Sequence, residues 1–194
     1  MEHAPPDLIV VGVTAILGFV VLPLWIFMGL ADYFCHRATD IEHTSGTRES
    51  TMHLAQFALV GVPLLAGLLL WVDAGVLILA AVFAILHHIV AFVDVRYANK
   101  TRDVYPIEQM IHSFLEILPL TAFILLACLN FDQLEALTGV GGAVTDFGFH
   151  LRSPALPVWY VATVLISALI VGLVPYLEEL FRCLRAQRCS SLQQ

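Results

Sequence analysis

Long apolar stretches separated by short polar loops dominate the hydrophobic pattern of this chain. An α-helix needs about 20 apolar residues to cross a bilayer core about 30 Å thick. Five stretches reach that length, at residues 8–33, 48–72, 74–98, 106–130 and 156–184. The turn at 72–75 is so short that the helices on either side of it should be antiparallel neighbours. The sequence therefore predicts an all-α fold, an integral membrane helical bundle of five transmembrane helices.

Composition supports this class of protein. The mean hydropathy is +0.86, with 59% hydrophobic and 13% charged residues, whereas soluble domains are about 45–50% apolar and about 25% charged. We find no long-period repeat and expect a single transmembrane domain over residues 1–186, followed by a short polar tail over residues 187–194. The first residues lack the basic region of a cleaved signal peptide, so we expect the first apolar segment to be a retained span.

The positive charges predict the orientation of the bundle. Of nine Lys and Arg residues, all except Arg152 lie on one side: Arg37, Arg48, Arg96, Lys100, Arg102, Arg182, Arg185 and Arg188. The positive-inside rule then places the N-terminus outside and the C-terminus in the cytoplasm. Because there is no basic patch beyond these short loops, we expect no nucleic-acid partner.

Carboxylates and histidines recur in the cytoplasmic half of four predicted helices. Three pairs have the spacing acid-x-x-x-His, which places both groups on one helical face. These pairs are Asp32 with His36, Glu49 with His53, and Glu108 with His112. In a fourth helix His87 and Asp94 lie two turns apart and again share a face.

Inward-facing imidazoles and carboxylates from several helices are typical of metal sites in the core of helical bundles. Such mixed ligands suit iron, zinc and manganese, and their number exceeds the four that one tetrahedral zinc takes. We therefore predict two divalent metal ions, iron first, with zinc or manganese as alternatives. The predicted ligands are Asp32, His36, Glu49, His53, His87, Asp94, Glu108 and His112. Because no cysteine belongs to this set, an iron–sulfur cluster is not expected.

Two further residues are expected to support the ligands without binding metal. His88 points about 100° away from the face of its neighbour His87. Glu116 lies about 12 Å along its helix from Glu108, deep in the apolar zone. We predict that both contact the ligands rather than the metals; a direct ligand, a proton relay and a partner of His87 are the alternatives for Glu116.

Structural roles compete with metal binding at several positions. Glu49 and Glu108 each lie in the first turn of a predicted helix, where a carboxylate stabilises the helix dipole. Helix capping explains neither His87 nor His112, however, and the recurrence of four acid–histidine pairs at one depth favours a shared site. Asp40, Glu42 and His43 lie in or beside a loop, and we expect them to be solvated. We expect Glu178 and Glu179 to pair with nearby arginines at helical spacing.

The segments DYFCHR, ESTMH, HHIVAFVDVRYA and PIEQMIHSFLE resemble a small family of multi-pass bacterial membrane proteins to which no activity is attached. This resemblance implies a location in the bacterial inner membrane. The ligand chemistry also resembles that of the membrane di-metal oxygenases, the fatty-acid hydroxylases and desaturases. Their HxxxH and HxxHH boxes are absent here, where Asp or Glu replaces many of the histidines.

These observations predict a membrane-embedded metalloenzyme, a hydroxylase- or oxygenase-like di-iron oxidoreductase that acts on a lipid or another lipophilic small molecule. Such an enzyme would need an electron donor as a partner, and the catalytic residues remain open. One alternative is a zinc-dependent hydrolase that uses the same ligands. The others are a metal-binding or metal-transporting protein without catalysis, and a haem protein in which His53 pairs with His87 or His112.

Overall fold

The computed structural model describes residues 6–139 and 145–192, and regular structure over these residues is helical. The helices are α1 (Pro6–Ile16), η1 (Leu17–Val21), α2 (Leu22–Ala38), η2 (Ile41–His43), α3 (Gly46–Leu69), α4 (Ala74–Thr101), α5 (Pro106–Leu129), α6 (Phe131–Thr138), α7 (Val158–Ser167), η3 (Ala168–Leu173) and α8 (Val174–Ser191). The prediction of an all-α fold is confirmed.

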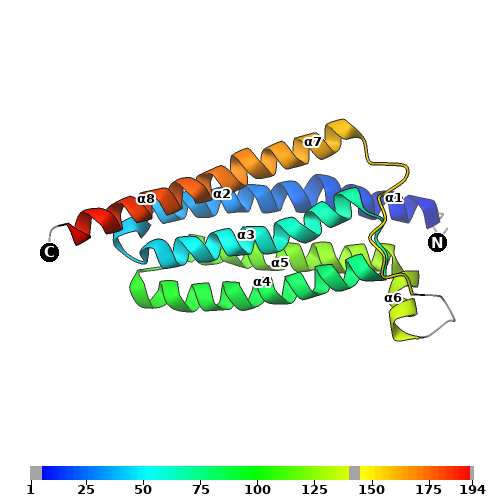
Figure 1. Cartoon of the computed structure of the whole chain (residues 1–194), viewed down its shortest axis with the longest axis horizontal. Coiled ribbons are helices and arrows are strands. Elements are labelled where there is room, and N and C mark those ends of the chain that lie inside the picture. The colour runs from blue at the N-terminus through cyan, green and yellow to red at the C-terminus, as the bar shows by residue number, and fades with distance from the viewer. Residues whose placement is uncertain (1–5, 140–144, 193–194) are drawn as a thin grey trace.

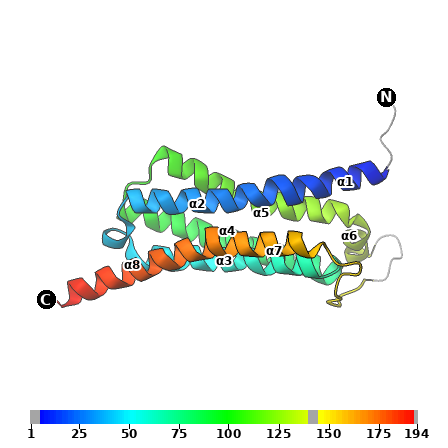
Figure 2. The same cartoon turned by 90° about the horizontal axis from the view of Figure 1, so that it is seen from above.

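Five helical segments are long and apolar enough to cross a membrane, as the sequence predicts. They are Leu8–Ala38, Gly46–Leu69, Ala74–Thr101, Pro106–Leu129 and Val158–Ser191. These segments lie side by side along the long axis of the molecule, and α1 begins at the opposite end from the end of α8 (Figures 1 and 2). The protein is therefore a multi-pass membrane protein with an odd number of spans.

Two of the spans contain π-helical segments next to a proline. Leu17–Val21 precedes Pro23, and Ala168–Leu173 precedes Pro175. A proline removes one backbone hydrogen bond and clashes with the carbonyl four residues earlier. The wider π turn accommodates this clash without ending the helix, so α1 continues into α2 and α7 into α8 as single spans.

The turn between α3 and α4 makes these helices antiparallel neighbours, as predicted. Asp73 caps the N-terminus of α4, because its side chain accepts a hydrogen bond of 3.0 Å from the backbone N–H of Val76. Two backbone hydrogen bonds join this turn to residues 150–152, which follow α6. Trp71 N–H donates to His150 O (2.9 Å), and Arg152 N–H donates to Leu69 O (2.9 Å).

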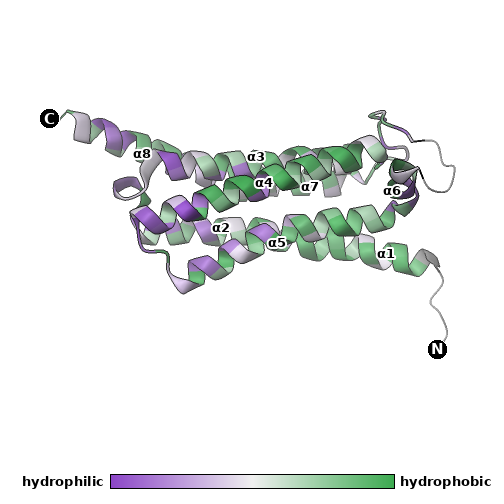
Figure 3. Ribbon diagram, turned by 90° about the horizontal axis from the view of Figure 1, so that it is seen from below, coloured by the Kyte–Doolittle hydropathy of each residue, from purple (hydrophilic) through white to green (hydrophobic). Residues whose placement is uncertain are grey.

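The two ends of the bundle differ in polarity (Figure 3). We call the end where α2, α4 and α8 finish and α3 and α5 begin the site end, and the opposite end the far end. The far end has a small apolar core of Ala66, Val72, Val76, Leu77 and Ala127. Polar residues gather at the site end, whereas large apolar side chains elsewhere cover the outer surface.

Three spans extend further at the site end than the hydrophobic pattern predicts. Helix α2 ends at Ala38, α4 at Thr101 and α8 at Ser191, each past its predicted boundary. The added turn of α2 carries His36, which is fully buried. Burial of this polar turn thus continues α2 beyond the apolar stretch, whereas the residues added to α4 (99–101) are exposed. The residues added to α8 are also mostly exposed, and the tail after residue 187 is helical as far as Ser191.

Candidate metal centre

Eight polar side chains from five helices meet at the site end, and we call them the inner cluster. They are Asp32 and His36 of α2, Glu49 and His53 of α3, Asp94 of α4, Glu108 and His112 of α5, and Glu179 of α8. All are buried except His112, whose side chain is 12% exposed. Of the eight predicted ligands, the structure brings together every one except His87.

The first group of potential ligands lies between α2 and α5. His36 Nε2 is 3.4 Å from Asp32 Oδ1 and 3.6 Å from Glu108 Oε1. His112 Nε2 is 2.9 Å from the same Asp32 oxygen. The acid-x-x-x-His spacing is the reason for this geometry, because it stacks both groups of each helix on the face that packs against the other helix.

The second group lies between α3 and α4. His53 Nε2 is 3.3 Å from Asp94 Oδ2 and 3.9 Å from Glu49 Oε1. Gln56, one turn further along α3 from His53, donates a hydrogen bond of 2.8 Å to Asp94 Oδ2. The amide therefore holds one oxygen of this carboxylate, while Asp94 Oδ1 has no hydrogen-bond partner among the described residues.

Glu179 joins the two groups. Its Oε2 lies 2.9 Å from His36 Nδ1, and its Oε1 lies 2.9 Å from His53 Nδ1. The two rings stack with centroids 4.3 Å apart and planes 7° apart. An ionised carboxylate only accepts hydrogen bonds, so both Nδ1 atoms carry hydrogen, and the Nε2 atom of each ring faces the other carboxylates.

The role of Glu179 was missed from the sequence, where Glu178 and Glu179 were expected to pair with arginines. Glu178 does so, with Arg37 at 3.3 Å and Arg182 at 3.4 Å. The expectation is wrong for Glu179, which is fully buried among imidazoles. A helical signal was present, because the buried Tyr176, Glu179 and Cys183 recur at i, i+3 and i+7.

The distances from Nε2 of His36 and of His53 to the nearest carboxylate oxygens suit ligands around a metal better than direct hydrogen bonds. Two ligands that each lie about 2.0–2.2 Å from a tetrahedral metal are about 3.3–3.6 Å apart. The two Nε2 separations, 3.4 Å for His36 and 3.3 Å for His53, fall within this range. Neither Nε2 has a hydrogen-bond partner within residues 6–139 and 145–192, and buried polar atoms without partners require an explanation.

Arg102 inserts between two carboxylates of the inner cluster. Its Nη2 is 2.5 Å from Glu49 Oε1, its Nη1 is 3.0 Å from Glu108 Oε2, and its Nη2 also pairs with Glu108 Oε1. Burial disfavours the charged guanidinium, but hydrogen bonds and charges from Glu108 and Glu49 outweigh that effect and raise the pKa of Arg102.

This position differs from the expectation that Arg102 is an ordinary positive-inside residue, because its side chain is only 2% exposed. Glu49 and Glu108 face the guanidinium from the first turns of α3 and α5. Both carboxylates therefore belong to the buried cluster rather than acting only as helix caps. The pattern of charges alone does not distinguish a buried arginine that directly follows a helix from a solvated one.

His87, His88 and Glu116 lie outside the groups of converging ligand atoms. His87 is 3% exposed and faces the interior, and neither of its ring nitrogens has a hydrogen-bond partner in the described part of the chain. The Nδ1 of His88 lies 2.8 Å from Ala84 O, and this residue lines a groove on the outer surface of α4 and α5. The structure thus separates His88 from the inner cluster, because it occupies a different helical face.

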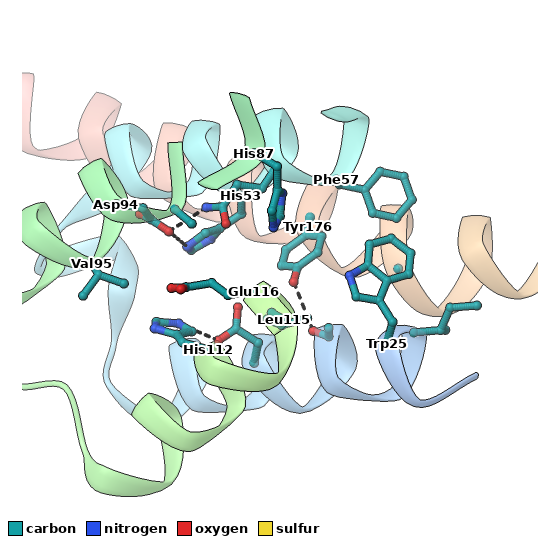
Figure 4. A pocket seen from close by; sticks show the side chains of 16 residues that line it. Trp25, His53, Phe57, His87, Asp94, Val95, His112, Leu115, Glu116 and Tyr176 are labelled. Carbon is teal, nitrogen blue, oxygen red and sulfur yellow. Dashed lines mark hydrogen bonds and ion pairs between the residues drawn. The ribbon is translucent and has the colours of Figure 1, made fainter. Parts of the chain in front are cut away.

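A cavity of about 40 Å³ adjoins the inner cluster on the side of the membrane interior (Figure 4). Asp32, His53, Asp94 and His112 form one wall, and Trp25, Phe57, Ala91 and Leu115 contribute apolar surface. Glu116 points into it between His112 and His53, and His87 and Tyr176 also line it.

Two other groups of acids and histidines have a different environment. Asp40, Glu42 and His43, which we call the loop cluster, lie beside η2, and both Asp40 and His43 are exposed. A hydrogen bond of 3.0 Å and the charge of Asp40 raise the pKa of His43. At the far end Asp146 and His150 are also exposed, and their segment contacts the turn before α4.

Comparison with protein-family models, curated proteins and solved structures finds no match for this chain. The resemblances to a bacterial membrane family and to membrane di-metal oxygenases therefore stay predictions. What the structure supports directly is a multi-pass helical membrane protein with a buried arrangement of His, Asp and Glu.

Proposed function

We propose that this protein is a membrane-embedded metalloenzyme in which the inner cluster binds two divalent metal ions, iron first, and oxidises a lipophilic substrate. The observation that carries this proposal is the pair of stacked imidazoles of His36 and His53. One carboxylate, Glu179, orients both of them, and their Nε2 atoms have no hydrogen-bond partner among the described residues.

Ring stacking supports two metals rather than one. The ring centroids of His36 and His53 are 4.3 Å apart with nearly parallel planes. Their Nε2 atoms would therefore bind two metals at neighbouring positions rather than one shared metal. Metals in two-metal sites lie about 3.5–4 Å apart. His36 would share one ion with Asp32, Glu108 and His112, and His53 would share the other with Glu49 and Asp94.

Electrostatics also supports bound cations. The inner cluster contains five buried carboxylates, those of Asp32, Glu49, Asp94, Glu108 and Glu179, and the guanidinium of Arg102 pairs with two of them, Glu49 and Glu108. With neutral imidazoles this leaves four excess negative charges in a membrane protein, which is costly without compensation. Two divalent cations would cancel that excess.

The protein's residues would have distinct roles around the metals. Bound iron would supply the redox chemistry, and carboxylates with imidazoles favour iron or manganese over softer ions. Glu179 would keep the ligand tautomers of His36 and His53, and Arg102 would hold Glu49 and Glu108 in place. His112 is the most exposed member of the inner cluster, so we propose that substrate approaches from the bilayer between α2 and α5.

We further propose that the site end faces the cytoplasm of a bacterial cell, where a soluble electron donor would reach it. This orientation follows from the concentration of Lys and Arg at the loops of that end, in contrast to the lone Arg152 at the far end.

The test is to purify the protein in detergent and measure bound metals by mass spectrometry together with an absorption spectrum. About two irons per chain without a Soret band would support the proposal. Zinc in place of iron would indicate the hydrolase, and a Soret band would indicate haem. Variants His43→Ala and His36→Ala provide a matched comparison of a solvated and a buried imidazole.

A metal-free protein would overturn the proposal if it also failed to take up added iron, manganese or zinc. In that case protonated histidines would balance the carboxylates, and the inner cluster would be a structural polar network. Unchanged folding of the His36→Ala/His53→Ala double variant in metal-free detergent, measured by circular dichroism, would show that metal loss and misfolding are separate effects.

A further inference from the structure

His87 is the predicted ligand that the metal groups do not include. It lies seven residues before Asp94 on α4, about 10 Å further toward the membrane interior. It is 3% exposed, and neither Nδ1 nor Nε2 has a hydrogen-bond partner in the described residues. A buried imidazole always carries at least one N–H donor, so this side chain lacks a partner for a group whose burial is costly.

The ring of His87 forms part of the wall of the cavity that adjoins the inner cluster (Figure 4). His53, Asp94 and His112 line the same cavity. A molecule in the cavity would therefore contact ligands of both proposed metals and the imidazole of His87. The ring nitrogens of His87 and the open coordination positions of the proposed metals therefore face the same cavity.

The size and lining of the cavity limit what can enter it. A volume of about 40 Å³ holds a few water-sized molecules and is too small for an acyl chain. Much of the remaining wall is apolar and comes from Trp25, Phe57, Ala91 and Leu115. Along this apolar part of the wall a water molecule finds no hydrogen-bond partner, so that part of the cavity favours a small apolar molecule. The volume and the lining of the cavity fit a neutral ligand of two heavy atoms whose lone pairs accept weak hydrogen bonds.

We propose that this cavity is the binding site of a diatomic reactant, dioxygen in the proposed oxidation, and that His87 holds the reactant through an imidazole N–H. This inference rests on the proposed metal centre and adds the site and the residue that receive the second reactant. The lipophilic substrate would then approach from a different side, where His112 is partly exposed.

The test uses nitric oxide as a diatomic probe on the full-length protein loaded with ferrous iron in detergent without oxygen. The dissociation constant of nitric oxide is followed through visible absorption, and iron content is measured on the same samples. His87→Phe keeps a planar ring but removes the N–H, and we expect binding to weaken about tenfold at unchanged iron content. His88→Phe is the matched control, because its neighbouring ring lines the outer groove, and it should bind like wild type.

A second variant tests the cavity without changing His87. Ala91→Leu fills space in the cavity wall, so we expect nitric oxide binding to weaken by about tenfold or more. Ala84→Leu on the same helix is its control, because Ala84 lines the outer groove. Weakening in both cavity variants and in neither control would support the inference.

Three results would overturn it in distinguishable ways. Equal nitric oxide binding in wild type, His87→Phe and Ala91→Leu, at equal iron content, would reject the diatomic site and leave the metal centre intact. Loss of iron in His87→Phe would make His87 a metal ligand instead. Failure of the wild-type protein to bind iron would reject the metal centre and this inference together.

Discussion

The inner cluster and the loop cluster contain the same kinds of side chains in different environments. In each, carboxylate oxygens and an imidazole nitrogen approach within 4.8 Å of one another. The ring of His43 in the loop cluster is exposed and has Asp40 as its hydrogen-bond partner. His36 in the inner cluster is fully buried, with Nδ1 held by Glu179 and Nε2 left without a partner in the described part of the chain.

This difference shows that composition and proximity do not by themselves define a metal site. Water satisfies the exposed Asp40 and His43, so a cation there would have to displace water for little gain. At the inner cluster burial removes that water, and the opposed carboxylates then require a counter-charge. The orientation of the imidazoles matters as much as their burial, because Glu179 holds Nδ1 of both rings so that their Nε2 atoms face the same region. Substitutions at each cluster test this difference.

The largest effect is expected for the double variant His36→Ala/His53→Ala. Removing both oriented imidazoles should reduce bound metal to background, because each proposed ion loses a nitrogen ligand and two of the remaining carboxylates, Glu49 and Glu108, also pair with Arg102. Metal content after purification and dialysis against iron measures the effect. Retention of wild-type metal content would remove the distinction between the two clusters.

Arg102→Gln should cause the next largest effect, on stability. It leaves Glu49 and Glu108 buried without their guanidinium, and breaking a buried ion pair in this way costs about 3–5 kcal/mol. Denaturant titration of the metal-free protein in mixed micelles measures the free energy of unfolding. The control is Arg37→Gln, because the pair of Arg37 with Glu178 is solvent-exposed and should contribute little. Equal unfolding free energies for the two variants would contradict a buried role for Arg102.

A moderate effect is expected for Glu179→Gln, which preserves size and shape. The amide oxygen can accept a hydrogen bond from only one imidazole, and the amide NH₂ cannot accept from the other. Loss of such an orienting group weakens metal binding by about 10–100-fold. Competition with a chelator of known affinity gives the constant. Glu178→Gln, one residue away and partly exposed, should leave the affinity unchanged.

The smallest effect is expected in the loop cluster. His43→Ala and Asp40→Asn remove solvated groups, so metal content and affinity should match those of wild type within error. The same measurements as for the double histidine variant apply. A loss of metal in either variant would show that the loop cluster contributes to binding. Burial would then not explain which of the two clusters binds metal.

Much of the fold follows from the hydrophobic pattern. The ends of the helices are less predictable, because polar turns continue some helices past the apolar stretch. All five spans are present, and the short turn before α4 makes α3 and α4 antiparallel. The pattern ends α2 too early because the turn that carries His36 is polar, and only its burial against Glu179 shows that this turn belongs to the bundle. The π-helical segments before Pro23 and Pro175 were likewise not predicted. They form because each span continues through its proline instead of ending there.

The sequence by itself determined the membrane class, the five helices and seven of the residues that meet at the site end. Helical periodicity suffices for this, because the spacing of acid and histidine sets their common face whatever the partner helix is. Tertiary packing is needed to place Glu179 in the inner cluster, to pair Arg102 with two of its carboxylates, and to direct His87 toward the cavity. Those assignments depend on the depth and rotation of one helix against another. Packing sets these quantities through contacts far apart in the chain, and no local pattern records them.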